Sequence, residues 1–138
     1  MRTQGTPPRQ AYNAQTAVNE GQIILAAEVT VDAPDFGHLE PMLDATLAAL
    51  ERHGVSEQPD AVVADAGYWQ TAQMQAISER GIEVLIPPDG NMREGIRPGW
   101  EHGLYERMRE KLTSDRGRKL YAQRKISVEP VYGQIVRH

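Results

Sequence analysis

Two carboxylates stand at positions in the sequence where they could do chemistry on phosphates. Asp65 ends the apolar run Ala61–Ala64, which is typical of a strand buried on both faces. Open α/β sheets bind ligands at the carboxyl ends of their strands, and protein carboxylates there can hold Mg²⁺ together with waters and phosphates. Glu129 follows a basic segment near the C-terminus. Each also has a simpler interpretation: Asp65-Ala66-Gly67 as the turn that leaves the strand, and Glu129 as a surface charge.

Other kinds of catalytic chemistry find little support in the sequence. The four His have no metal-ligand spacing, and neither a Gly-x-Ser-x-Gly motif nor a phosphate-binding Gly-rich loop occurs. Cys is absent, which excludes disulfides and thiolate sites and fits a reducing cytoplasm. No apolar run approaches the ~20 residues that a bilayer crossing needs. We therefore expect a cytoplasmic protein without a membrane partner.

Charge is distributed unevenly along the chain, whose formal net charge is −4. Residues 1–90 carry 4 Lys/Arg against 13 Asp/Glu, whereas residues 91–138 carry 11 against 6. Eight of these basic residues lie between Arg107 and Lys125. A basic stretch on an acidic protein is either a phosphate-binding face or a solvated helix surface, and charge alone leaves both interpretations open.

The hydrophobic pattern predicts a hairpin followed by alternating helices and strands, which indicates an α/β domain with a mixed sheet and flanking helices. We expect residues 1–10 to be a flexible lead-in and residues 11–138 to form the domain. Pro130 favours a kink or a new helix start near residues 127–130. The predicted strands are 11–18, 22–31, 61–64 and 82–86, and the predicted helices are 38–53, 71–80, 100–112 and 113–125.

Several short motifs occur in a fixed order along these elements. The most specific are Ala64-Asp65-Ala66-Gly67-Tyr68 and Val128-Glu129-Pro130-Val131-Tyr132-Gly133-Gln134-Ile135, and the others are Tyr12-Asn13-Ala14-Gln15, residues 22–30, 41–43, 108–112 and 117–121, and Arg124-Lys125. Together they resemble bacterial insertion-sequence transposases of the Asp-Asp-Glu type. The resemblance spans residues 12–135 and implies a ribonuclease-H-like catalytic domain.

The resemblance implies a metal-dependent transfer of DNA strands. In such transposases two Asp and one Glu hold two divalent ions, Mg²⁺ or Mn²⁺, and Asp65 matches the second Asp while Glu129 matches the Glu. The implied partners are the DNA of the transposon ends and either a second copy or a full-length transposase. The basic segment ahead of the Glu is expected to lie along DNA phosphates, and its DNA-binding residues would be Arg116, Arg118, Lys119, Tyr121, Arg124 and Lys125.

Three departures from the family pattern bear on activity. The family's first Asp lies on a strand ahead of Tyr12, where this sequence has eleven residues and neither Asp nor Glu. Val136 stands where family members usually carry Lys, and the sequence ends at His138, before the Glu-bearing helix would normally finish. We therefore expect a ribonuclease-H-like domain truncated at both ends, without its first strand and inactive alone.

Two other functions use the same residues differently. A non-catalytic DNA-binding or regulatory remnant would compete with full-length transposase for DNA ends and would bind DNA without metal. A small-molecule-binding α/β domain would instead have a pocket near Asp65 and would be indifferent to DNA.

Overall fold

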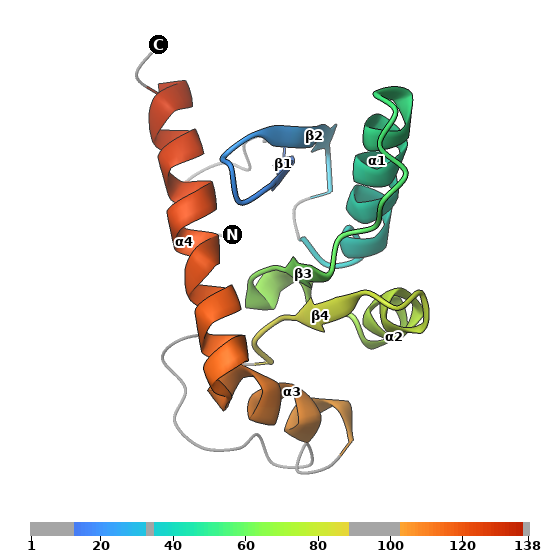
Figure 1. Cartoon of the computed structure of the whole chain (residues 1–138), viewed down its shortest axis with the longest axis vertical. Helices are drawn as coiled ribbons and strands as arrows, with labels where there is room; N and C mark the ends of the chain where they lie inside the picture. Colours follow the sequence, from blue (N-terminus) through green and yellow to red (C-terminus); the bar gives the residue numbers. More distant parts are fainter. Residues whose placement is uncertain (1–12, 33–34, 89–102, 137–138) are drawn as a thin grey trace, which may run out of the picture.

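The computed structural model describes residues 13–32, 35–88 and 103–136, without the side chains of residues 128–136. The predicted lead-in at residues 1–10 lies outside these ranges. The described part is a mixed α/β structure, as the sequence predicts (Figure 1). Its elements are β1 (Asn13–Val18), β2 (Ile24–Thr30), α1 (Leu39–Arg52), β3 (Ala61–Val63), the 3-10 turn η1 (Ala66–Tyr68), α2 (Thr71–Glu79), β4 (Glu83–Leu85), α3 (Leu104–Thr113) and α4 (Asp115–Val136).

β1 and β2 form the predicted antiparallel hairpin, with Asn13 opposite Thr30. Asn19 closes the turn, because its side-chain Oδ1 accepts a hydrogen bond from the backbone N–H of Ile23 at 3.0 Å. The backbone N–H of Gln22 also donates to the carbonyl oxygen of Asn19 at 3.0 Å. Asn favours such turns because its short side chain can hydrogen-bond the nearby backbone.

β3 and β4 pair in parallel, with Val62 opposite Val84. Parallel strands need a long crossover, which η1 and α2 provide. Within the described residues no backbone hydrogen bonds join this pair to the hairpin, so the strands form two separate two-stranded sheets. The sequence predicts one mixed sheet, whereas the described strands form an antiparallel pair and a separate parallel pair.

α1 and α2 end close to the predicted positions, and the side chain of Gln73 on α2 hydrogen-bonds the backbone at the start of α1. Gly54 and Gly81 follow the two helices with φ angles of 80° and 82°, a conformation that glycine adopts without strain. The amide of Gln73 on α2 accepts from the backbone N–H of Glu40 at 3.0 Å and donates to the carbonyl of Gly37 at 2.8 Å. This amide thereby satisfies backbone groups at the start of α1.

α3 and α4 meet at Ser114, close to the predicted boundary between helices 100–112 and 113–125. The hydroxyl Oγ of Ser114 accepts from the backbone N–H of Gly117 at 3.1 Å, which caps the first turn of α4. The predicted new helix start near residues 127–130 is wrong, because α4 continues to Val136. Pro130 lacks an N–H donor and crowds the carbonyl four residues earlier, a local cost that the 22-residue helix accommodates.

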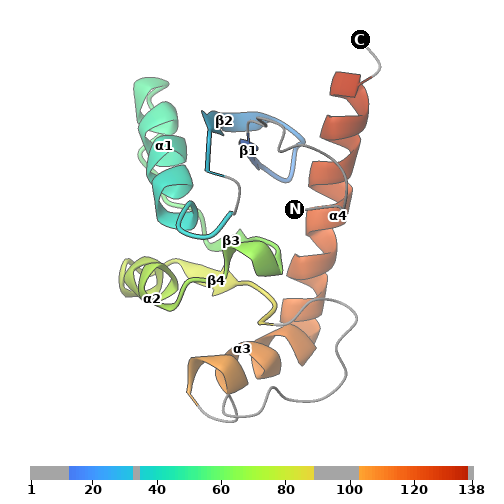
Figure 2. The same cartoon turned by 180° about the vertical axis from the view of Figure 1, so that it is seen from behind.

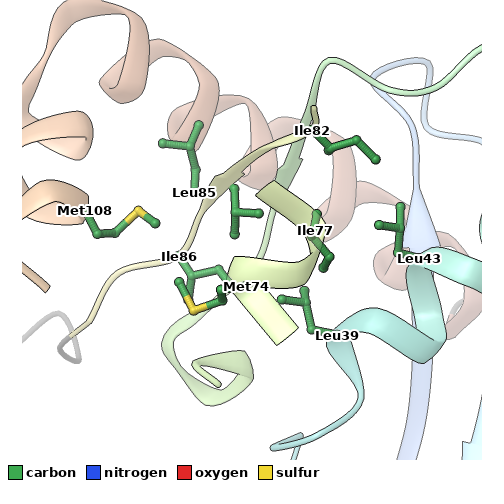
Figure 3. Close-up of a cluster of buried hydrophobic side chains, with 9 residues drawn as sticks. Leu39, Leu43, Met74, Ile77, Ile82, Leu85, Ile86 and Met108 are labelled. Carbon is green, nitrogen blue, oxygen red and sulfur yellow. The ribbon is translucent and has the colours of Figure 1, made fainter. Parts of the chain in front are cut away.

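The apolar core gathers around β4, which α1, α2 and α3 enclose (Figure 3). Buried side chains from all four elements pack together there: Leu39, Leu43, Met74, Ile77, Ile82, Val84, Leu85, Ile86 and Met108. The hairpin contributes none of the buried apolar side chains of the described residues. Val29 of β2 and the following Val31 are instead 68% and 76% exposed.

α4 packs against α3 and β3, and its C-terminal half reaches the level of the hairpin (Figure 2). This helix carries both the basic segment and Glu129, so the fold brings that region alongside the strand that leads to Asp65. None of the helices in the described ranges combines the length and the apolar character that a membrane span requires.

Candidate functional site

Asp65 lies two residues after the end of β3 and caps η1 with its side chain. Its backbone is extended, with φ −80° and ψ 174°, and its Oδ1 accepts a hydrogen bond from the backbone N–H of Gly67 at 3.0 Å. The sequence placed Asp65 at the carboxyl end of a strand, and that position is confirmed. The simpler interpretation as a turn residue is also correct. The two are compatible, because among the described residues this cap engages Oδ1 and leaves Oδ2 for another partner.

A second carboxylate, Asp35, faces the same turn. A Cβ built on Gly67 would lie 3.1 Å from Oδ1 of Asp65 and 3.2 Å from Oδ2 of Asp35. The two carboxylate oxygens are therefore at most about 6.3 Å apart, the sum of these distances. Because Gly67 lacks a side chain, both carboxylate oxygens can approach this position, where the next nearest atom is Cβ of Asp35 at 3.6 Å.

Two amides of β1 hold Asp35 in this position. Asn13 Nδ2 donates to Asp35 Oδ1 at 3.0 Å, and Gln15 Nε2 donates to the same oxygen at 3.3 Å. Residues two apart on a strand share a face, which is why both amides can reach one carboxylate. Gln15 is only 3% exposed, and its Oε1 is buried without a hydrogen-bond partner in the described structure.

Sequence reasoning did not identify Asp35 or Gln15 as site residues. Gln15 entered only as part of the motif Tyr12-Asn13-Ala14-Gln15. The alternation of amide side chains at Asn13 and Gln15 was an available signal. It indicates a polar strand face but does not say which carboxylate will meet it.

Glu129 lies on α4, and its side chain is outside the described part of the structure. The packing of α4 on β3 brings the two predicted metal-ligating residues onto neighbouring elements. Within the ranges that are described, three or more His, Asp or Glu side chains nowhere gather as a metal-binding group. The pairing of Asp65 with Glu129 therefore stays a prediction.

Two of the predicted DNA-binding residues make contacts inside the protein. Arg116 pairs with Glu83 on β4, with its Nη2 and Nε at 3.0 Å and 3.3 Å from Oε2. Arg118 Nε donates to the carbonyl oxygen of Thr113 at the end of α3, at 3.0 Å. These contacts fix the start of α4 against the core. Lys119 and Lys125 are exposed.

Tyr121 and Arg124 contact each other one turn apart on α4. The guanidinium carbon of Arg124 lies 5.4 Å from the centre of the Tyr121 ring, within range of a cation–π interaction. Nε of Arg124 is buried and has no hydrogen-bond partner among the described residues. The Arg124 guanidinium therefore lies over the Tyr121 ring, and its Nε–H donor has no acceptor among the described residues.

Comparison with known proteins identifies the family. Residues 2–137 match the family described as Transposase DDE domain. No curated protein and no solved structure matches the chain. The family match covers nearly all of the sequence, including both predicted carboxylates and the whole basic segment of α4. This chain belongs to the transposase DDE domain family.

Proposed function

We propose that residues 11–138 form part of the catalytic domain of a DNA transposase, in which Asp65 and Glu129 are two of three metal-binding carboxylates. The observation that carries this proposal is the position of Asp65. It stands at the carboxyl end of β3, fixed by the N–H of Gly67, in a chain of the transposase DDE domain family. The protein would act on DNA in the bacterial cytoplasm, as a homo-oligomer or with a full-length transposase.

The donor atoms near Asp65 fit a hard divalent cation such as Mg²⁺ or Mn²⁺. Carboxylate oxygens are the ligands that these ions prefer, and Gly67 places no side chain of its own beside Oδ1 of Asp65. When bound, the metal supplies charge stabilisation to the transferred phosphoryl group and activates the attacking hydroxyl. Asp65 and Glu129 would hold it, and the basic residues of α4 would hold the DNA backbone beside it.

The arrangement of the described strands supports a ribonuclease-H-like domain whose first strand is not among them. By the family resemblance, that strand lies between the hairpin and the first strand of the parallel pair. The hairpin and the β3–β4 pair are separate sheets in the described structure. An inserted strand that paired with both would convert them into one mixed sheet.

Purified residues 1–138 are expected neither to cut nor to join DNA, because no acidic residue precedes Tyr12 to complete the three carboxylates. The assay is nicking of a supercoiled plasmid that carries the terminal repeats of the parent insertion sequence, with Mg²⁺ or Mn²⁺. Metal-dependent nicking that Asp65→Ala abolishes would contradict this expectation.

The catalytic proposal itself is tested on a longer polypeptide. The genomic DNA directly upstream of Met1 is sequenced, and an in-frame region encoding an apolar strand that ends in Asp is added to the expressed protein. We expect this longer protein to nick the plasmid, and Asp65→Ala and Glu129→Ala each to abolish nicking. Activity that survives Asp65→Ala would remove Asp65 from the catalytic set.

A non-catalytic DNA-binding role is the second candidate, favoured by the basic residues of α4. We expect residues 1–138 to bind duplex DNA in EDTA with strong salt dependence. If Arg118, Lys119, Arg124 and Lys125 each neutralise one phosphate, raising salt from ~50 to ~200 mM should weaken binding roughly 100-fold. Fluorescence anisotropy of a labelled duplex measures this change.

The salt slope also separates individual residues. Lys119→Gln and Lys125→Gln are each expected to lower the slope of log affinity against log salt by about 0.9. Arg52→Gln, which removes a charge at the end of α1, is the matched control and should leave the slope unchanged. An affinity for DNA that does not change with salt concentration would exclude α4 as the DNA contact. Equal slopes of log affinity against log salt in all three variants would exclude it as well.

A further inference from the structure

We propose that Asp35 is a metal ligand of this domain, and that Asp35, Asp65 and the side-chain oxygen of Gln15 line one site for a divalent cation. The proposal rests on the proposed function, because it assigns a further residue to the same metal site. Neither the family resemblance nor the sequence pattern assigned Asp35 or Gln15 a role. Contacts between three separate segments carry the proposal: β1, the residues before α1, and the turn after β3.

The first observation is the space at Gly67. Carboxylate oxygens of Asp35 and Asp65 flank the place where a Cβ would stand, at 3.2 Å and 3.1 Å. Two carboxylates so close repel each other unless a positive charge lies near them. Among the described residues, no Lys or Arg side chain contacts either carboxylate. A cation between them would supply the missing charge.

The second observation is the unpaired oxygen of Gln15. The Nε2 atom of this amide donates to Asp35, so the reverse orientation would place Oε1 against a carboxylate oxygen, acceptor against acceptor. The orientation of the amide is therefore determined, and Oε1 is left buried without a donor among the described residues. An acceptor buried in this way is costly unless something pairs with it. A bound cation, directly or through one of its waters, is such a partner.

The oxygen atoms proposed as ligands are of the kind that divalent cations such as Mg²⁺ bind. Two carboxylates and one amide carbonyl are oxygen ligands of the kind that Mg²⁺ and Mn²⁺ take. Mg²⁺ also retains several waters, so the spacing of up to about 6.3 Å between the carboxylate oxygens, the sum of the two distances at Gly67, allows one carboxylate to bind through water. Asn13 would act by positioning, because its amide holds Asp35 in place.

Titration of the whole chain with MnCl₂ in an isothermal calorimeter tests the assignment. Asp35→Asn keeps the shape of the side chain and an oxygen to accept from Asn13 and Gln15 but removes the charge. We expect it to weaken Mn²⁺ binding at least ~10-fold. Asp60→Asn is the matched control, since Asp60 is an exposed carboxylate at the opposite end of β3, and it should change the affinity less than ~2-fold.

Gly67→Ala tests the same site without changing charge. The added methyl would occupy the space between the two carboxylates and should also weaken Mn²⁺ binding, while thermal unfolding followed by circular dichroism shows whether the variant is folded. Wild-type affinity in a folded Asp35→Asn variant would overturn the proposal. If Asp65→Asn still weakened binding, the proposed function would survive that result. If wild-type protein bound no Mn²⁺, the site of Asp35, Asp65 and Gln15 would be overturned, whereas the proposed function would still be decided by the nicking assay on the longer polypeptide.

Discussion

Replacing Ile77 with alanine is expected to lower the free energy of unfolding by about 2–5 kcal/mol. Ile77 is 0% exposed and lies on α2, facing the cluster around β4 (Figure 3). Truncation removes buried methyl and methylene groups and leaves a cavity that the neighbouring side chains fill only in part. Small domains have total stabilities of about 5–15 kcal/mol, so the loss is a large fraction. Urea unfolding followed by circular dichroism measures it as a lower midpoint.

Ile126→Ala is the matched control for this substitution. Ile126 is also on a helix but is 60% exposed, so its truncation should change stability by no more than about 0.5 kcal/mol. Equal losses from the two substitutions would show that α2 does not face the core in the way described.

Replacing Gly117 with alanine is expected to destabilise the protein by about 1–3 kcal/mol. In an open helical position the same change stabilises by about 1 kcal/mol, because alanine is the better helix former. Here a Cβ would overlap the backbone carbonyl oxygen of Lys111, which belongs to α3 and cannot swing away as a side chain could. The sign of the effect is therefore the test of how closely α3 approaches α4. Chemical denaturation gives that sign directly.

Gly21→Ala serves as the comparison. A Cβ there would meet the side chain of Asn19, with its nearest atom at 3.3 Å, and no backbone within 4 Å. We expect a change within about 0.5 kcal/mol. Stabilisation by Gly117→Ala would contradict the close helix junction, and with it the position of the basic segment relative to the core.

The local pattern predicted most of the fold, because strands and helices follow from the spacing of apolar residues. Strand 61–64 and helix 71–80 are observed as Ala61–Val63 and Thr71–Glu79. The position of Asp65 at the carboxyl end of a strand was predicted for the same reason, whereas the prediction that this strand is buried on both faces is wrong, because all three residues of β3 are only partly buried. Pro130 misled the prediction, because its local preference is weaker than the continuation of a long helix.

Contacts between distant segments were not predictable in this way. The ion pair of Arg116 and Glu83 joins residues 33 positions apart, and no local pattern selects Glu83 over other acids. Asp35 reaches Gly67 only because the segment before α1 folds back over the turn after β3. The spacing of apolar residues does not indicate which distant segments of the chain meet. The position of Asp35 beside Asp65 is therefore visible only in the folded structure.

The hairpin packs on α1 but contributes no side chain to the apolar core, and this has a consequence for the order in which the molecule comes apart. Native proteins open in cooperative units, and units with few buried apolar contacts open at lower free energy. The hairpin is such a unit, since it contributes none of the core side chains within the described residues and no backbone hydrogen bonds to the other sheet. Its opening would carry away Asn13 and Gln15, and with them the hydrogen bonds that hold Asp35. Backbone amides of β1 and β2 would therefore exchange with solvent before those of β4, and the arrangement of carboxylates would be lost while the core was still intact.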